Sequence, residues 1–369
     1  MRSSESLTIS APGRVCLFGE HQDYLGLPVI PAAISLRITL TGRRRTDNRI
    51  RIDLPDIRDQ VDFPLTDTTY REKRDYFRSG INVMRREGFS FATGFDCSVH
   101  GNIPINSGTS SSTALITAWI QFLGLMSEQQ AALSPAETAR LAHLAEVVEF
   151  DEPGGMMDHY SIALGDILYL EFQPEVTARR LPASLGTFVL GDSGEPKDTI
   201  GILARVKDQV REVTGRIERK FPEFSLSTVA RPALKQYRPE MTEEQFTLLE
   251  GTVENRELTV QAAQLLNAPA PDEQEFGRLL NRHQAVLRDV LRISTPQIDR
   301  MLAAALEAGA YGGKINGSGG GGCMFVYAPE HPERVARAIR ESGGTTYIVD
   351  VDQGVQTTST TAKERLRES

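Results

Sequence analysis

The stretch INSGTSSSTALITA, residues 105–118, places one glycine among small hydroxyl residues and runs directly into an apolar segment. The apolar residues repeat with helical spacing, which predicts a buried helix over residues 111–126. The first backbone N–H groups of a helix have no partner within it, and the helix dipole is positive there, so the loop is a candidate anion site. The lysine of the G-x-x-x-x-G-K-S/T pattern is missing, which excludes a Walker-type phosphate loop. Taken alone, the stretch fits a polar helix start slightly better than a phosphate site.

The length and composition of the chain indicate a two-domain globular protein. Its 369 residues exceed one ordinary domain, and 40% of them are apolar, which is enough for real cores. The net charge of −8 argues against a nucleic-acid-binding protein, which usually carries a basic face. The sequence has neither a long apolar run nor an apolar signal core, so we expect a cytoplasmic protein without a membrane span. Cys16, Cys97 and Cys323 are scattered and form neither a disulfide framework nor a metal-ligand pattern.

The order of strand and helix patterns indicates an α/β or α+β protein in two halves. Short apolar runs within residues 7–42 and at residues 95–101 predict strands, and the second half starts near residue 180. Ser134 and Glu137 predict a capping box at the start of one helix. Helices are expected over residues 70–87, 111–126, 134–150, 199–219, 243–267, 272–292 and 296–308.

A cluster of polar residues ends the stretch APGRVCLFGEHQDYLG, residues 11–26. Glu20, His21, Asp23 and Tyr24 follow Gly19, where an apolar strand ends. Polar residues at a strand end are typical of a small-molecule site. A solvated turn with one satisfied histidine fits this composition equally well.

Two further stretches carry acidic or glycine-rich patterns. In AEVVEFDEPGGMMDHYSIALG, residues 145–165, Glu146 lies among apolar helix residues and Asp158 follows two methionines. A partly buried acid needs a partner, although by itself a helix-start aspartate is the better interpretation of Asp158. In YGGKINGSGGGGCMFV, residues 311–326, four consecutive glycines are costly to order. They indicate either a close approach of the backbone or a flexible hairpin.

The four stretches together are more specific than any one, because they occur in the order and at the intervals of one family. The sequence resembles the GHMP kinases, which include galactokinase, homoserine kinase, mevalonate kinase and phosphomevalonate kinase. APGRVCLFGEHQDY is similar to the first family motif, PINSGTSSSTAL to the second and GGKINGSGGGGCMFV to the third. The resemblance spans residues 8–350.

The resemblance implies an α+β fold with two domains and an active site in the cleft between them. The N-terminal domain, residues 1–180, would resemble the second domain of ribosomal protein S5 and carry the phosphate loop and the acceptor site. The C-terminal domain, residues 181–355, would be ferredoxin-like. Residues 356–369 are expected to form a loose tail.

The resemblance also implies a kinase that depends on ATP and Mg²⁺. Asp158 aligns with the catalytic base, and Arg14 aligns with the basic residue that keeps this carboxylate ionised. Ser111 and Glu146 align with the Mg²⁺ ligands. Phosphoryl transfer needs mainly positioning and charge neutralisation, so one carboxylate, one cation and one metal ion suffice. The residues expected to bind ATP are Ser107, Gly108, Thr109, Ser110, Ser111, Ser112, Gly319 and Gly320.

The acceptor is expected to be a sugar, because GEHQDY is similar to the galactokinase motif. The resemblance implies that Glu20, His21, Asp23 and Gly155 bind the sugar. A carboxylate can accept from two neighbouring hydroxyls at once, which suits a vicinal diol. The anomeric hydroxyl would receive the phosphate, and galactose is the best single candidate.

Departures from the galactokinase pattern leave the identity of the acceptor open. Cys16, Phe18 and Thr109 replace the residues usual in galactokinases, and DSGEPKDT, residues 192–199, is closer to mevalonate kinase. The alternatives are a mevalonate kinase, a kinase of another sugar (fucose, heptose, arabinose or a uronic acid) and a catalytically inactive sugar-sensing regulator. We expect a small-molecule acceptor and ATP as partners, no nucleic acid, no membrane, and a monomer or a homodimer.

Overall fold

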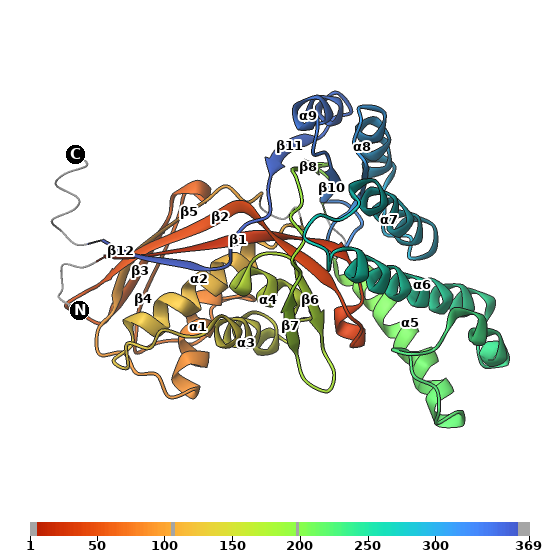
Figure 1. The fold of residues 1–369 in the computed structure, drawn as a ribbon. Coiled ribbons are helices and arrows are strands. Elements are labelled where there is room, and N and C mark those ends of the chain that lie inside the picture. The colour runs from red at the N-terminus through yellow and green to blue at the C-terminus, as the bar shows by residue number, and fades with distance from the viewer. Residues whose placement is uncertain (1–5, 105–107, 197–198, 361–369) are drawn as a thin grey trace.

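Two β-sheets organise the chain in the computed structural model, which describes residues 6–104, 108–196 and 199–360 (Figure 1). The larger sheet has six strands in the order β12–β1–β2–β5–β3–β4 and lies mainly in the N-terminal half. The smaller sheet has four antiparallel strands in the order β11–β8–β10–β9 and lies in the C-terminal half. The predicted α+β architecture in two halves is confirmed.

The long antiparallel strands β1 (Ser6–Phe18) and β2 (Ile30–Arg44) form the centre of the larger sheet. Four helices cover one face of this sheet (Figure 1), and a two-stranded hairpin lies beside it. The other strands are β3 (Arg49–Leu54), β4 (Asp59–Pro64), β5 (Phe95–Gly101), β12 (Gln356–Thr360), and the hairpin strands β6 (Leu168–Glu171) and β7 (Thr177–Arg180). The helices are α1 (Tyr76–Arg86), α2 (Ser111–Met126), α3 (Pro135–Glu146) and α4 (Met157–Leu164).

The C-terminal half packs helices around the smaller sheet and extends α5 and α6 away from it (Figure 1). Its strands are β8 (Phe188–Asp192), β9 (Gly312–Ile315), β10 (Cys323–Tyr327) and β11 (Thr345–Val349). Its helices are α5 (Thr199–Lys220), α6 (Glu243–Leu265), α7 (Glu273–Ala285), α8 (Pro296–Glu307) and α9 (Pro332–Glu341). A π-helical turn, Val286–Val290, continues α7. No helix in these described residues is both long and apolar enough to cross a membrane.

Helix α2 is fixed under the larger sheet by aromatic packing. Trp119 stacks on Phe122 with 5.5 Å between the ring centroids, and it meets Phe77 and Phe95 edge-on. Each such aromatic pair contributes about 0.5–1.5 kcal/mol beyond the area it buries. The packing therefore holds the N-terminus of α2 at a defined place below β1. Residues 108–110, the serine-rich loop, directly precede α2 and are held with it.

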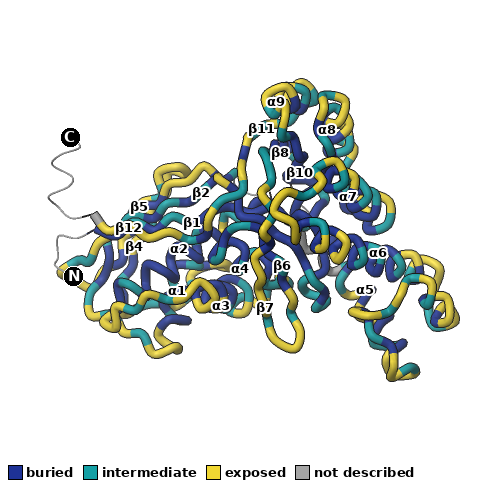
Figure 2. The backbone as a smooth tube through the Cα atoms, in the orientation of Figure 1, coloured by how far each residue is buried: buried dark blue, intermediate teal, exposed yellow. Residues whose placement is uncertain are grey.

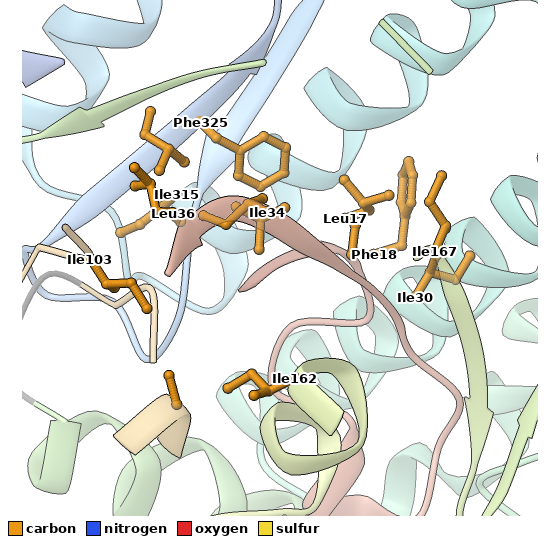
Figure 3. Packing of buried hydrophobic residues seen from close by; sticks show 14 of the residues in the cluster. Leu17, Phe18, Ile30, Ile34, Leu36, Ile103, Ile162, Ile167, Ile315 and Phe325 are labelled. Carbon is orange, nitrogen blue, oxygen red and sulfur yellow. The ribbon is translucent and has the colours of Figure 1, made fainter. Parts of the chain in front are cut away.

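The end of β1 packs into the C-terminal half. The Phe18 ring stacks on His283 with 5.7 Å between centroids and meets Phe276 of α7 edge-on at 5.9 Å. Leu17 belongs to the same buried apolar cluster as Ile315 of the smaller sheet (Figure 3). The buried stretches of backbone continue from one half into the other (Figure 2). The end of β1, with Leu17 and Phe18, therefore lies where the two halves meet.

The expectation of a loose tail over residues 356–369 is wrong for residues 356–360. They form β12, which pairs antiparallel with β1 from Ser6 to Ser10 and adds an edge strand to the larger sheet. Its sequence, QTTST, has no apolar residue, so no hydrophobic pattern marks it as a strand. Threonine nevertheless favours strands, and an exposed edge needs no apolar side chain. The rest of the tail lies outside the described residues.

Candidate active site

A cavity of about 240 Å³ lies where the end of β1 meets the serine-rich loop, the end of α3, the turn before α4 and the loop after β9. Its wall contains ten of the residues that the sequence predicts for the site. These are Arg14, Glu20, His21, Asp23, Gly108, Ser110, Ser112, Glu146, Gly155 and Asp158. These residues span up to 144 positions of the sequence, from Arg14 to Asp158, so only folding brings them together.

Asp158 and Arg14 form a bidentate ion pair in this cavity. The Nε and Nη2 atoms of Arg14 each donate to one carboxylate oxygen of Asp158 at 2.7 Å. The Ser110 hydroxyl donates to Oδ2 of the same carboxylate at 2.6 Å. Burial would raise the pKa of Asp158, but Arg14 and Ser110 together hold this pKa below its ordinary value. Asp158 is therefore an ionised carboxylate on the wall of the cavity.

The serine-rich loop is held by hydrogen bonds to its backbone as well as by the Ser110 hydroxyl. The Gly108 carbonyl accepts from Nη1 of Arg14 and, at 2.9 Å, from the Asn316 side chain. The Thr109 carbonyl accepts from the Arg14 backbone N–H at 3.3 Å, and Thr109 is buried. Ser110 then takes the left-handed conformation, with φ of +61°, directly before α2 begins. Ser107 lies outside the described residues.

The structure places Ser112, not Ser111, on the wall of the cavity. Glu146, at the end of α3, also lies on this wall, and its Oε2 atom is 2.9 Å from Nε2 of His159. A hydroxyl and a carboxylate suit Mg²⁺, which is usually held by one or two carboxylates together with substrate phosphates. Ser112 and Glu146 lie on the same cavity wall and therefore suit such an ion. Ser111, the expected partner of Glu146, does not line this wall.

Glu20 lies on the cavity wall, and both of its carboxylate oxygens also have partners within the protein, so its contact with the acceptor stays a prediction. Its Oε2 accepts from Nζ of Lys314 at 2.5 Å, and its Oε1 accepts from the Gly317 backbone N–H at 2.9 Å. Lys314 is fully buried, and it also donates to the Cys16 carbonyl at 2.8 Å. The Cys16 N–H in turn donates to the Asn316 side chain at 2.9 Å. Glu20, Lys314 and Asn316 thus join β1 to the start of the glycine-rich loop.

The four consecutive glycines of this loop, residues 319–322, contact other segments of the chain and do not line the cavity. A Cβ atom on Gly319 would lie 2.6 Å from Ile293, and the Gly320 N–H donates to the Ile293 carbonyl at 2.8 Å. The Gly322 N–H likewise donates to the Glu195 carbonyl. The glycines therefore permit a close backbone approach, which was one of the two interpretations of the sequence. The expected contact of Gly319 and Gly320 with ATP has no counterpart on the cavity wall, where Gly317 and Ser318 lie instead.

His21, Asp23 and Tyr24 line the other end of the cavity. Nε2 of His21 is 3.0 Å from the Ser318 carbonyl, which only accepts, so this nitrogen carries a proton and Nδ1 accepts from the Tyr24 hydroxyl at 2.7 Å. Burial lowers the pKa of His21 to about 4, so its ring is neutral at pH 7. Burial and the nearby charge of Asp158 raise the pKa of Asp23 to about 6. A Cβ atom on Gly155 would lie 1.9 Å from an Asp23 oxygen, so only glycine fits there.

Comparison with known proteins agrees with these observations. Residues 75–166 match the model of the GHMP kinases N terminal domain, residues 262–345 that of GHMP kinases C terminal, and residues 2–44 the galactokinase galactose-binding signature. A mevalonate kinase of Thermococcus onnurineus is 30% identical over 365 residues, which cover 94% of this chain and 97% of the relative. A galactokinase of Enterococcus faecalis is 28% identical over 383 residues, with 94% of each chain covered.

A solved structure shows the same fold. Galactokinase from Lactococcus lactis, crystallised with galactose, superposes with a TM-score of 0.85 at 21% identity, covering 96% of this chain and 95% of the other. The fold and the site define a two-domain phosphotransferase that acts on an alcohol group. The chain belongs to the GHMP kinase family, whose members use ATP as a co-substrate.

The sequence did not indicate Lys314, Asn316 and His159 as residues of the site. All three are buried, and each supports a predicted residue: Lys314 holds Glu20, Asn316 holds the serine-rich loop, and His159 contacts Glu146. The available signals for these residues in the sequence were a lysine within the short strand segment GGKI and a histidine directly after Asp158. Neither signal says which distant residue is the partner.

Proposed function

We propose that this chain transfers the γ-phosphate of ATP to the anomeric hydroxyl of a sugar. The observation that carries the proposal is Asp23, a carboxylate whose burial raises its pKa to about 6 at the end of the cavity next to Asp158. The Asp23 oxygens accept from the Tyr24 backbone N–H at 2.9 Å and the Met157 backbone N–H at 3.5 Å. An apolar acceptor would leave the remaining acceptor positions of this carboxylate without a partner. Facing neighbouring hydroxyls, it would accept two hydrogen bonds.

The charges around this cavity support a neutral polyol as the portion of the acceptor that lies within it. Its two arginines are already paired, Arg14 with Asp158 and Arg74 with Glu152 at 2.9 Å. Of the described residues on this wall, no other lysine or arginine remains to pair with an acceptor carboxylate inside this cavity. The carboxylates on the same wall are Glu20, Asp23, Glu146, Glu152 and Asp158.

The proposed reaction uses Asp158 as the base. Its carboxylate accepts the proton of the sugar hydroxyl while the hydroxyl oxygen bonds to the γ-phosphorus, and the bond from phosphorus to the bridging oxygen breaks to release ADP. Arg14 keeps Asp158 ionised and offsets charge beside the transferred group. When bound at Glu146 and Ser112, Mg²⁺ would neutralise charge on the phosphates.

Galactose is the first acceptor to test, because residues 2–44 match the galactokinase galactose-binding signature. A coupled ADP-release assay should compare galactose, fucose, arabinose, heptoses, hexuronates and mevalonate. We expect turnover with a hexose or a close derivative. Asp23→Ala should weaken sugar binding by about 2 kcal/mol, the scale for a charged hydrogen-bond acceptor. ATP affinity measured on the same variant is the internal control and should change less than about twofold, far below this loss of sugar binding.

Mevalonate kinase is the second candidate, favoured by the relative from Thermococcus onnurineus at 30% identity. The same screen separates the two. Mevalonate as the best acceptor, or an Asp23→Ala variant with unchanged acceptor binding, would contradict the sugar-kinase proposal.

A further inference from the structure

A second cavity, of about 550 Å³, adjoins the acceptor end of the active site. The two cavities share Asp23, Tyr24, Gly154 and Gly155 on their walls. Two of these four residues are glycines, so little side-chain volume separates the two spaces. Helix α5 forms the far wall of the second cavity, next to the turn that joins β1 to β2 (Figure 1).

Two cations of α5, Lys207 and Arg211, line this wall and reach toward the active site. The Lys207 Nζ donates to the Pro153 carbonyl at 3.2 Å and lies 5.6 Å from the centre of the Tyr24 ring. Nη2 of Arg211 donates to the Tyr24 carbonyl at 2.7 Å. Both cations thus contact neutral groups.

Among the described residues, neither cation has a carboxylate within 4.0 Å. The nearby acid Glu212 pairs with Arg216 instead. Like charges four residues apart on a helix repel each other, which destabilises the helix. Burial, and then the charge of Arg211, lower the pKa of Lys207, and the more distant carboxylates of Asp208, Asp23 and Asp151 only partly oppose this. A negative group between Lys207 and Arg211 would relieve this repulsion.

The other polar side chains of the second cavity suit an anion near Lys207 rather than near Glu218. Thr214, Ser225 and Ser227 add hydroxyl groups to the wall. Glu218 also lines the cavity, but it lies seven residues beyond Arg211, about two helical turns along α5. Asp23 lies between the two cavities, so an acceptor that contacts it can extend into both.

We propose that the second cavity binds an anionic substituent of the acceptor, a carboxylate or a phosphate, through Lys207 and Arg211. The substituent lies on the sugar carbon chain away from the hydroxyl that faces Asp158. This inference rests on the proposed sugar-kinase function and narrows its substrate class to acidic sugars. The first cavity still receives a neutral polyol portion, in agreement with its paired arginines.

The test compares galactose, galacturonate and galactose 6-phosphate as acceptors in steady-state kinetics. The two anionic sugars separate a carboxylate site from a phosphate site. We expect kcat/KM for one of them to exceed that for galactose by about tenfold or more, the scale of hydrogen bonds to a charged group. Lys207→Met and Arg211→Met should each reduce this ratio at least severalfold, and Lys207→Arg should keep most of it. Arg219→Met, on the same helix but outside the lining, should keep the ratio.

The outcomes separate failure of this inference from failure of the proposed function. If galactose is used as well as both anionic sugars, the anion subsite is overturned while the sugar kinase stands. If Lys207→Met lowers kcat/KM equally for all three sugars, the lysine only supports Tyr24 and the subsite is overturned. If no sugar is phosphorylated, the proposed function fails and the subsite fails with it.

Discussion

Replacing Lys314 by Met should strongly destabilise the protein, because it leaves a buried carboxylate without its cation. Lys314 is 0% exposed and Glu20 is 2% exposed. Loss of the ammonium removes three hydrogen bonds, to Glu20, to the Cys16 carbonyl and to the Ile315 carbonyl. Breaking a buried ion pair by removing one partner typically costs about 3–5 kcal/mol. We expect a loss of this size, a large share of the about 5–15 kcal/mol by which domains are usually stable.

The assay is urea unfolding at pH 7 with the midpoint and the slope m fitted separately. In the double variant, Glu20→Gln removes the uncompensated charge while its side-chain oxygen still accepts from the Gly317 N–H. The double variant should therefore recover about 2 kcal/mol relative to Lys314→Met alone, within the range of coupling between groups in direct contact. Lys220→Met is the matched control, since Lys220 is 59% exposed in its pair with Glu240 and should lose at most about 1 kcal/mol. A loss below about 1 kcal/mol for Lys314→Met, or no recovery in the double variant, would refute the reasoning.

Three further predictions concern catalysis. Asp158→Asn should lower kcat at least ~100-fold in steady-state kinetics with ATP binding largely kept, and near-full turnover would remove Asp158 as the base. Because the pKa of Asp23 is raised to about 6, acceptor KM should fall as pH rises from 5 to 7. A carboxyl with a raised pKa binds its proton more tightly in the folded state, so the free energy of unfolding should decrease as pH rises from about 4 to about 6. Asp23→Asn should flatten the pH profiles of both KM and stability. Profiles unchanged by this substitution would argue against Asp23 as the titrating group that binds the acceptor. In Mg²⁺ titrations, Glu146→Gln and Ser112→Ala should each raise the concentration needed for half-maximal rate, non-additively in the double variant, because both act on one ion. Ser111→Ala should leave the titration unchanged, and the opposite order of the two serine variants would restore Ser111 as the ligand.

Local features of the fold were predictable because their causes are local in the sequence. Helical spacing set the bounds of α2, and the capping box of Ser134 and Glu137 is confirmed at the start of α3. β12 was not predictable from hydrophobic pattern, because an exposed edge strand needs no apolar side chain. Its place beside β1 depends on backbone hydrogen bonds to a strand at the other end of the chain.

The site was predictable as a set of residue positions but not as a set of contacts. The order of the motifs predicted that Arg14 lies beside Asp158, and in the structure the two side chains form an ion pair. Glu20 was assigned to the acceptor from the resemblance of GEHQDY to the galactokinase motif, and its ion pair with Lys314 was not predictable because Lys314 lies 294 positions away. The choice between Ser111 and Ser112 depends on the rotation of the first turn of α2, which the sequence does not fix.

The most direct test of the account is the structure of the reaction product. The protein should be incubated with ATP, Mg²⁺ and either galactose with its acidic derivatives or mevalonate, and the products followed by ³¹P and ¹³C NMR. The account predicts a new phosphate ester on the anomeric carbon of a sugar, formed together with ADP. A phosphate on the primary hydroxyl of mevalonate, or on a sugar carbon other than the anomeric one, would contradict it.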